Sequence, residues 1–206
     1  MSLPIEHYAL VGDCHTAALV GNDGSIDWLC LPRFDSGACF AALLGGPEHG
    51  RWLLAPAVRP YQVQRMYRGD GLILETQFAT EAGRVRVIDF MPLSDKRWDI
   101  VRIVEGITGQ VDVCMELIIR FDYGSIVPWV HQAGGALVLT AGPDTVELAA
   151  SVPIKGENMK SVAQFNVSAG QRHSFVLNYH PCHCASVSIS ACSASSVDRV
   201  CTCEGR

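Results

Sequence analysis

The sequence lacks the features that mark membrane, nucleic-acid-binding and disordered proteins. No apolar run approaches the ~20 residues that a membrane-spanning helix needs. Positive charge is scarce, because 16 lysines and arginines face 21 acidic residues for a net charge of −5. A basic footprint for nucleic acid is therefore missing. Charged residues make up only 18% of the chain and hydrophobic residues 49%, which is the balance of a folded globular protein.

The start of the chain has no positively charged segment followed by an unbroken apolar run, which is the pattern of a secretory leader. We therefore expect a cytoplasmic protein with neither membrane nor nucleic acid among its partners. The 206 residues leave room for one sizeable domain.

Cysteine is abundant, but the nine residues fall into two groups. Four lie in the patterned part of the chain, where small buried thiols are expected: Cys14, Cys30, Cys39 and Cys114. Five crowd the end: Cys182, Cys184, Cys192, Cys201 and Cys203. Without a secretory signal a disulfide framework has little support. The C-x-C spacing near the end also differs from the usual C-x₂₋₄-C of zinc sites, so we expect no metal and no cofactor.

Alternation of apolar and polar residues dominates the chain up to residue 179. In residues 111–121 apolar side chains occupy every second position, which is the period of a half-buried strand. Residues 72–78 and 84–87 show the same period. Turn-forming clusters separate such runs: Gly69-Asp70-Gly71, Glu81-Ala82-Gly83, Gly134-Gly135, Gly142-Pro143-Asp144 and Gly170-Gln171. The pattern predicts a mainly β protein built as a large antiparallel β-sandwich.

One short helix is expected beside the strands. Ser36 is placed to cap it, apolar residues in 40–44 supply a stripe, and Gly45-Gly46 ends it. Beyond residue 181 the pattern stops, and no period is sustained. We therefore predict a sandwich domain over residues 1–181 and an unstructured tail over residues 182–206.

Trp28, Arg33, Phe34 and Asp35 form the sharpest cluster of candidate binding residues. A tryptophan can stack on a sugar face, and the two charged side chains can hydrogen-bond to hydroxyls. On this interpretation the loop faces a sugar pocket or a domain interface. The alternative, which we favour from the alternation in residues 27–31, puts Trp28 in the core and uses Arg33–Asp35 to fix the turn before the helix.

Asp122, Tyr123 and Trp129 are the second group of candidates. They flank a glycine and a proline and so lie on a connection, where functional residues concentrate. Two interpretations stay open: an interdomain packing surface, or a tyrosine that orders a turn.

Two short motifs invite functional interpretations that we reject. Asp13, Cys14 and His15 are metal-ligating or nucleophilic types, but adjacent residues of a strand point to opposite faces. His15 is expected in a turn. Gly21-Asn22-Asp23-Gly24 lacks the lysine of a phosphate-binding loop and predicts a hairpin turn.

Several motifs follow one another in a distinctive order. Residues 8–45 contain the hairpin and then the Trp28-x4-Arg33-Phe34-Asp35 run. The later segments are Pro47–Trp52, Val87–Pro92, Val101–Gly106, Arg120–Gly124 with Pro128-Trp129, Ala141–Asp144 and Phe175–Pro181. Together, over residues 5–181, this order resembles the N-terminal domain of glycoside hydrolase family 15, the bacterial glucoamylase- and trehalase-like enzymes.

The resemblance implies a β-sandwich that packs against a barrel of paired helices. In the family the barrel carries two catalytic glutamates for inverting hydrolysis of α-glycosides, an acid and a base roughly 6.5–9.5 Å apart. The barrel motifs are not found in these 206 residues. We therefore expect an accessory domain with no catalytic residue of its own, which serves an α-glucosidase of glucoamylase or trehalase type. An apolar face left uncovered would favour self-association.

Two rival functions remain open. A free-standing carbohydrate-binding module would need Trp28, Trp52 and Trp129 on one exposed surface. A cysteine-rich metal-binding or redox protein would depend on the last 25 residues, 182–206.

Overall fold

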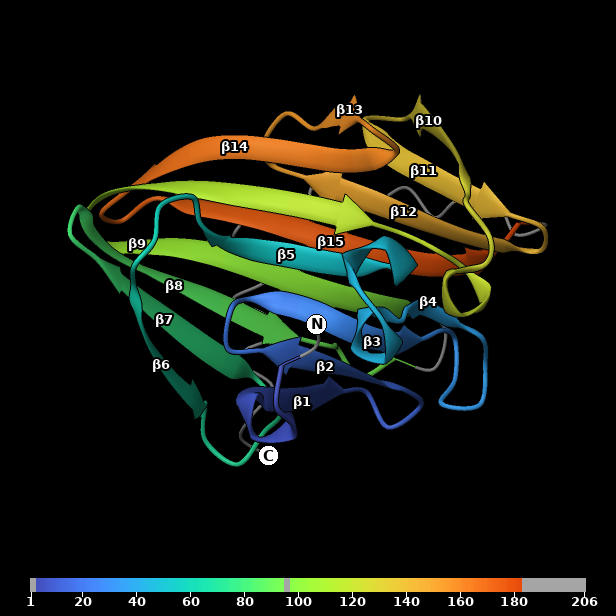
Figure 1. Ribbon diagram of the computed structural model, residues 1–206, viewed down its shortest axis with the longest axis horizontal. Helices are drawn as coiled ribbons and strands as arrows, with labels where there is room; N and C mark the ends of the chain where they lie inside the picture. The colour runs from blue at the N-terminus through green and yellow to red at the C-terminus, as the bar shows by residue number, and fades with distance from the viewer. Residues whose placement is uncertain (1–2, 95–96, 183–206) are drawn as a thin grey trace.

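The computed structural model describes residues 3–94 and 97–182, and fifteen antiparallel strands make up most of them (Figure 1). They form two layers that share the long strand β9 (Trp98–Ile118). The first sheet contains β1 (Tyr8–Gly12), β2 (Ala17–Gly21), β3 (Ser25–Cys30), β5 (Arg51–Pro56), the second half of β9, β14 (Lys160–Ser168) and β13 (Lys155–Glu157). Strand β4 (Ala38–Phe40) pairs with β3.

The second sheet contains the first half of β9 and seven other strands. In spatial order these are β6 (Gln62–Tyr67), β7 (Leu74–Thr80), β8 (Gly83–Phe90), β9, β15 (Arg172–Pro181), β12 (Asp144–Ala150), β11 (Ala136–Ala141) and β10 (Trp129–Ala133). The predicted antiparallel β-sandwich is therefore confirmed.

Strand β9 belongs to both sheets because it bends near its middle. Its first half pairs with β8 and β15, and its second half with β5 and β14. A side chain on Gly106 would collide with the carbonyl of Ser168, and Gly109 has a φ of +68°. Both positions therefore require glycine, and the close backbone approach they permit lets one strand cross between layers.

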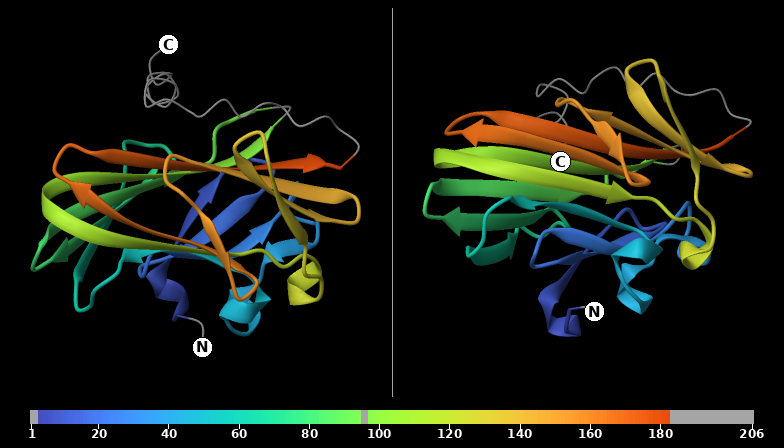
Figure 2. Two further views of the ribbon diagram at one scale, coloured as in Figure 1. Left: turned by 90° about the horizontal axis from the view of Figure 1, so that it is seen from above. Right: turned by 45° about the horizontal axis from the view of Figure 1, so that its top comes forward.

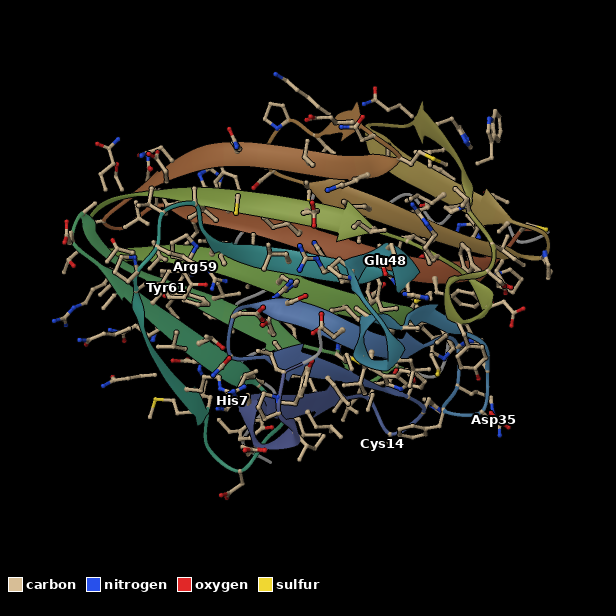
Figure 3. The ribbon with its side chains drawn as sticks, viewed as in Figure 1. His7, Cys14, Asp35, Glu48, Arg59 and Tyr61 are labelled. Carbon is tan, nitrogen blue, oxygen red and sulfur yellow. The ribbon has the colours of Figure 1, made fainter. Side chains whose placement is uncertain are left out.

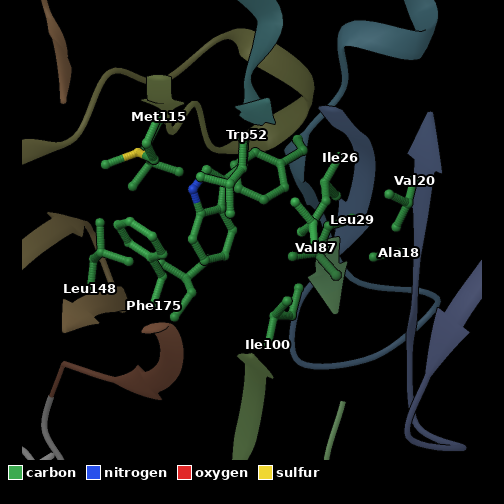
Figure 4. Packing of buried hydrophobic residues seen from close by; sticks show 14 of the residues in the cluster. Ala18, Val20, Ile26, Leu29, Trp52, Val87, Ile100, Met115, Leu148 and Phe175 are labelled. Atoms are coloured by element: carbon green, nitrogen blue, oxygen red, sulfur yellow. The ribbon is translucent and has the colours of Figure 1, made fainter. Parts of the chain in front are cut away.

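The hydrophobic core fills the space between the layers (Figure 4). The predicted alternation in residues 111–121 is confirmed, since Val113, Met115 and Leu117 are each 1% exposed. Trp52 on β5 is fully buried and lies between side chains of the two sheets. Burial of such apolar surface is the main stabilising term of the sandwich.

The helix predicted after Ser36 does not form. Residues 38–40 are strand β4, and only η2 (Ala42–Leu44) turns, as a single 3-10 turn. Phe40 lies opposite Leu29 of β3 and is fully buried in the core, so tertiary packing outweighs the local helical pattern. The Ser36 hydroxyl instead accepts a hydrogen bond of 3.2 Å from the N–H of Arg33.

The other helical pieces of the described chain are also three-residue 3-10 turns: η1 (Ile5–His7), η3 (Pro47–His49) and η4 (Asp122–Gly124). Within residues 3–94 and 97–182 no helix is long and apolar enough to cross a membrane. The predicted hairpin turn at residues 21–24 is confirmed, with the Gly24 N–H donating to the Gly21 carbonyl at 3.0 Å. The predicted tail lies outside the described residues, apart from Cys182.

Candidate functional site

The 3-10 turns lie together on one side of the molecule. Figure 2 shows η1, η2, η3 and η4 projecting in the same direction from the first sheet. The four turns come from three segments that are far apart in the sequence, and η3 contacts both η2 and η4. We call the region around η2, η3 and η4 the turn surface, defined by residues 31–37, 42–49 and 122–126 together with Trp28.

A β-bulge on β3 explains why Trp28 faces the turn surface. Val20 pairs with Ile26 and Leu19 with Trp28, so Asp27 is an extra residue on β3. The bulge shifts the alternation and turns Trp28 outward. Its half-buried ring packs there beside a small apolar cluster separate from the main core: Cys30, Ala38 and Ala41. The prediction that Trp28 belongs to the core is therefore wrong.

Tyr123 completes this outer cluster through an unusual turn. Its ring lies 6.1 Å from that of Trp28, at an interplanar angle of 43°. Asp122, Tyr123 and Gly124 have φ values of 50°, 58° and 103°, so all three are left-handed. Two consecutive non-glycine residues in this region are costly and persist only where surroundings hold them.

Hydrogen bonds and packing hold the turn in that conformation. The Ser125 hydroxyl donates to the Asp122 carbonyl at 2.8 Å, and Phe121 and Ile126 form an isolated bridge across the turn. Gly124 lies against His49, where a side chain would meet the imidazole at 2.8 Å. The turn thus presents Tyr123, which is 46% exposed, at a fixed place beside Trp28.

The loop before β4 presents the remaining predicted residues to solvent. Arg33 Nε lies 3.0 Å from Asp35 Oδ1, and both side chains are largely exposed. Between them Phe34 is 63% exposed. Figure 3 shows Asp35 at the periphery of the molecule, pointing away from the sandwich. The predicted role of Arg33 and Asp35 in fixing a turn agrees with this geometry, although the turn precedes a strand instead of a helix.

The predicted site residues are thus only partly brought together. Trp28 and Tyr123 are in contact, and Asp122 lies beside the loop, since a side chain on Gly37 would lie 3.8 Å from its Cα. Trp129 lies elsewhere, on β10 of the second sheet, stacked on His131 at 4.7 Å. The rival platform of three tryptophans does not exist, because Trp52 is buried in the core.

His15 lies in a turn, as predicted, but the expectation that Asp13, Cys14 and His15 follow one another along a strand is wrong, because β1 ends at Gly12 and β2 begins at Ala17. Asp13 Oδ1 accepts hydrogen bonds from the N–H groups of His15 at 2.9 Å and Thr16 at 2.8 Å. Cys14 is exposed, so the expected burial of its thiol is wrong, and Figure 3 shows it at the edge of the fold. Among the residues that the structure describes, no group of three or more histidine, cysteine or acidic side chains is arranged to hold a metal.

The other cysteines of the patterned region are less accessible. Cys30 and Cys39 are buried as predicted, and Cys114 is half-buried. Burial raises the pKa of all three thiols, because it disfavours the thiolate. A thiol that resists ionisation is a poor nucleophile, so these residues have a packing role.

Acidic side chains on the second sheet alternate with arginines. Glu75 Oε2 binds Arg86 Nη1 at 2.9 Å, and Glu105 binds both Arg86 and Arg172. Burial opposes the ionisation of Glu105, but the arginine hydrogen bonds outweigh it and lower its pKa. On the first sheet burial likewise opposes ionisation of Glu116, yet Lys160 and Arg51 lower its pKa. Carboxylates held ionised in this way are unsuited to protonate a leaving group.

A buried ion pair between the sheets escaped the sequence analysis. Arg102 and Asp89 are both 0% exposed, and Arg102 Nε lies 2.8 Å from Asp89 Oδ1. The guanidinium also donates to the carbonyls of Trp52 and Gly24, and so ties the second sheet to β5 and to the β2–β3 turn. The available signal was one charge on each strand among inward positions that are otherwise apolar, namely Val85 and Val87 on β8 and Ile100 and Val104 on β9.

Comparison with known proteins places this arrangement in a family. Residues 1–201 match the family described as "Trehalase-like, N-terminal". A trehalase from Mycolicibacterium smegmatis is 30% identical over 208 residues, which cover 86% of this chain and 31% of the relative. A Mycobacterium tuberculosis trehalase is 28% identical (81% and 28%), and one from Thermoplasma volcanium is 26% identical (73% and 25%).

The chain therefore spans less than a third of the length of these three relatives, with the matched part ranging from 25% to 31%. The family match covers the whole described sandwich, including the turn surface and both halves of β9. With this match following the motif order and the sandwich, the chain belongs to the family of trehalase-like N-terminal domains.

Proposed function

We propose that this sandwich is the non-catalytic N-terminal domain of a glycoside hydrolase family 15-like α-glucosidase, of glucoamylase or trehalase type. Its role is to support, and partly wall, the active site of a helical catalytic domain. The observation that carries the proposal is the match of the chain to trehalases over a quarter to a third of their length. The substrate expected for the complete enzyme is an α-glucoside.

The chemistry of the described carboxylates supports a non-catalytic role. Inverting hydrolysis needs one carboxyl that stays protonated and another that is free to activate water. Glu105 and Glu116 have pKa values lowered by their basic neighbours. Asp89 is enclosed with Arg102, and Asp27 accepts hydrogen bonds from the hydroxyls of Tyr8 and Ser25. These acids therefore stabilise the fold and leave no acid–base pair among them.

The turn surface is the face we assign to the catalytic domain. It exposes four large apolar side chains on its short turns and loop: Phe34 at 63%, Leu44 at 67%, Tyr123 at 46% and Ile126 at 45%. Clustered apolar groups of this kind mark interaction sites. Arg33, Asp35 and Asp122 add polar groups that can bind a facing domain or the hydroxyls of an α-glucoside at its border.

Enzyme assays test the proposal at two levels. The purified chain should release no glucose from trehalose or maltose, and measurable turnover would refute a non-catalytic role. Grafted in place of the matching segment of the M. smegmatis trehalase, residues 3–181 should keep trehalose hydrolysis. In that chimera Tyr123→Asp should lower kcat/KM at least tenfold, since a charge would face the partner domain.

Met66→Asp provides the matched control, because Met66 is 65% exposed but lies on β6, away from the turn surface. A chimera that folds and yet loses activity equally with either substitution would contradict the assignment of the turn surface. Thermal unfolding of the isolated chain is measured for both variants, because a lowered melting temperature would show that the loss of activity comes from a folding defect.

A further inference from the structure

Strand β10 is an unprotected edge of the second sheet. Among the described strands it pairs only with β11. Trp129 is 72% and Val130 44% exposed, and residues 129–133 include no lysine, arginine, aspartate or glutamate. Proteins usually blunt an exposed strand edge with charge, proline or a cover, because its free backbone groups invite pairing with another chain.

The other edges of the sandwich carry such protection. The Tyr67 hydroxyl at the end of β6 accepts a hydrogen bond from the Leu10 N–H and donates to the Leu10 carbonyl, both at 2.9 Å. This contact ties the edges β6 and β1 to one another. Strand β13 is only three residues long and exposes Lys155 and Glu157. Strand β4 is also only three residues long, and all three are buried. Edge β10 therefore stands apart from β1, β4, β6 and β13.

We propose that two copies of this chain associate through β10, paired antiparallel about a two-fold axis at His131. This register uses all five residues of the strand and places Val130 opposite Gln132 of the second copy. An edge that pairs with itself closes the interface and leaves no template for further growth. The proposal concerns the second sheet and does not depend on the function assigned to the turn surface.

The side chains of β10 suit this occupant. Since none carries a formal charge, the two-fold axis brings no like charges together. Trp129 comes to lie opposite Ala133 of the second copy, so the largest side chain of the strand meets the smallest. Trp129 is already stacked on His131 at 4.7 Å, which limits the rotamer freedom that pairing has to remove.

Sedimentation equilibrium of the purified chain tests the proposal. The unmodified chain should show a dimer that dissociates on dilution. Val130→Lys/Gln132→Lys should raise the dissociation constant roughly tenfold or more, because lysines then face one another twice across the axis. Val130→Lys/Gln132→Glu should keep the dimer, since each lysine then faces a glutamate.

Met66→Lys serves as the control, because it adds a lysine to the protected edge β6. Circular dichroism melts establish that each variant is folded. A chain that stays monomeric at millimolar concentration overturns the proposal. Equal weakening by the two double variants overturns the register, and equal weakening by Met66→Lys overturns the assignment to β10.

Discussion

Replacing Arg102 with methionine should lower the free energy of unfolding by about 3–5 kcal/mol, the cost of breaking a buried ion pair on one side. The guanidinium donates to Asp89 at 2.8 and 3.3 Å, to the Trp52 carbonyl at 2.6 Å and to the Gly24 carbonyl at 2.8 Å. The side chains of Arg102 and Asp89 are 0% and 1% exposed. Methionine keeps the apolar stem but leaves the Asp89 charge without a partner and two carbonyls without their donor.

Urea unfolding followed by circular dichroism measures the effect, with the m value checked for constancy. Arg33→Met is the control, because it breaks an exposed pair with Asp35 and should cost at most about 1 kcal/mol. Arg102→Met/Asp89→Leu should recover much of the loss, since no buried charge is then left unpaired. A cost below about 1 kcal/mol for Arg102→Met would refute the reasoning, because breaking the buried pair would then cost no more than breaking an exposed one.

Two further predictions concern charge and backbone. Burial opposes ionisation of Glu105, yet hydrogen bonds from two arginines lower its pKa. The ionised carboxylate therefore stabilises the fold at pH values above the ordinary carboxyl pKa of about 4.3. This stabilisation is lost as the pH falls through the lower pKa of the native state. Glu105→Gln should therefore flatten the acid side of the stability–pH profile, and Glu81→Gln, which removes a carboxyl from an exposed turn, is its control. Gly124→Ala should cost about 1–3 kcal/mol, because φ is +103° and a Cβ would lie 2.8 Å from the His49 ring. Gly156→Ala, with nothing within 4 Å, is its control in the same urea assay, and equal shifts in midpoint would contradict the argument.

The two-layer sandwich could be predicted from the sequence, because the period-two alternation of apolar and polar residues indicates which side chains face inward. Residues 111–121 follow that rule through β9 and into the following connection, and all six apolar positions are buried. The Gly21–Gly24 turn was equally predictable, since Gly24 adopts the left-handed backbone, with a φ of +85°, that a tight hairpin turn requires. Short-range signals of this kind survive folding because tertiary contacts reinforce them.

Local pattern failed where a register shift or a distant partner decides. The helix expected after Ser36 does not form because Phe40 pairs with Leu29, and the local sequence cannot reveal that contact. The sequence of residues 27–31 does not indicate that Asp27 forms a bulge, because the register shift depends on how β2 aligns with β3. The Tyr123 turn likewise needs His49 and Trp28 beside it.

The bulge at Asp27 connects the fold to the turn surface. Asp27 is held on the outer face by the hydroxyls of Tyr8 and Ser25, so the extra residue has a defined place. Without it, regular alternation would turn Trp28 inward, and the strained Tyr123 turn would lose the ring it packs against. A fold selected for stability alone has no reason to keep both a bulge and a left-handed tyrosine, which together cost free energy. Their juxtaposition therefore supports the proposal that this surface meets a partner domain.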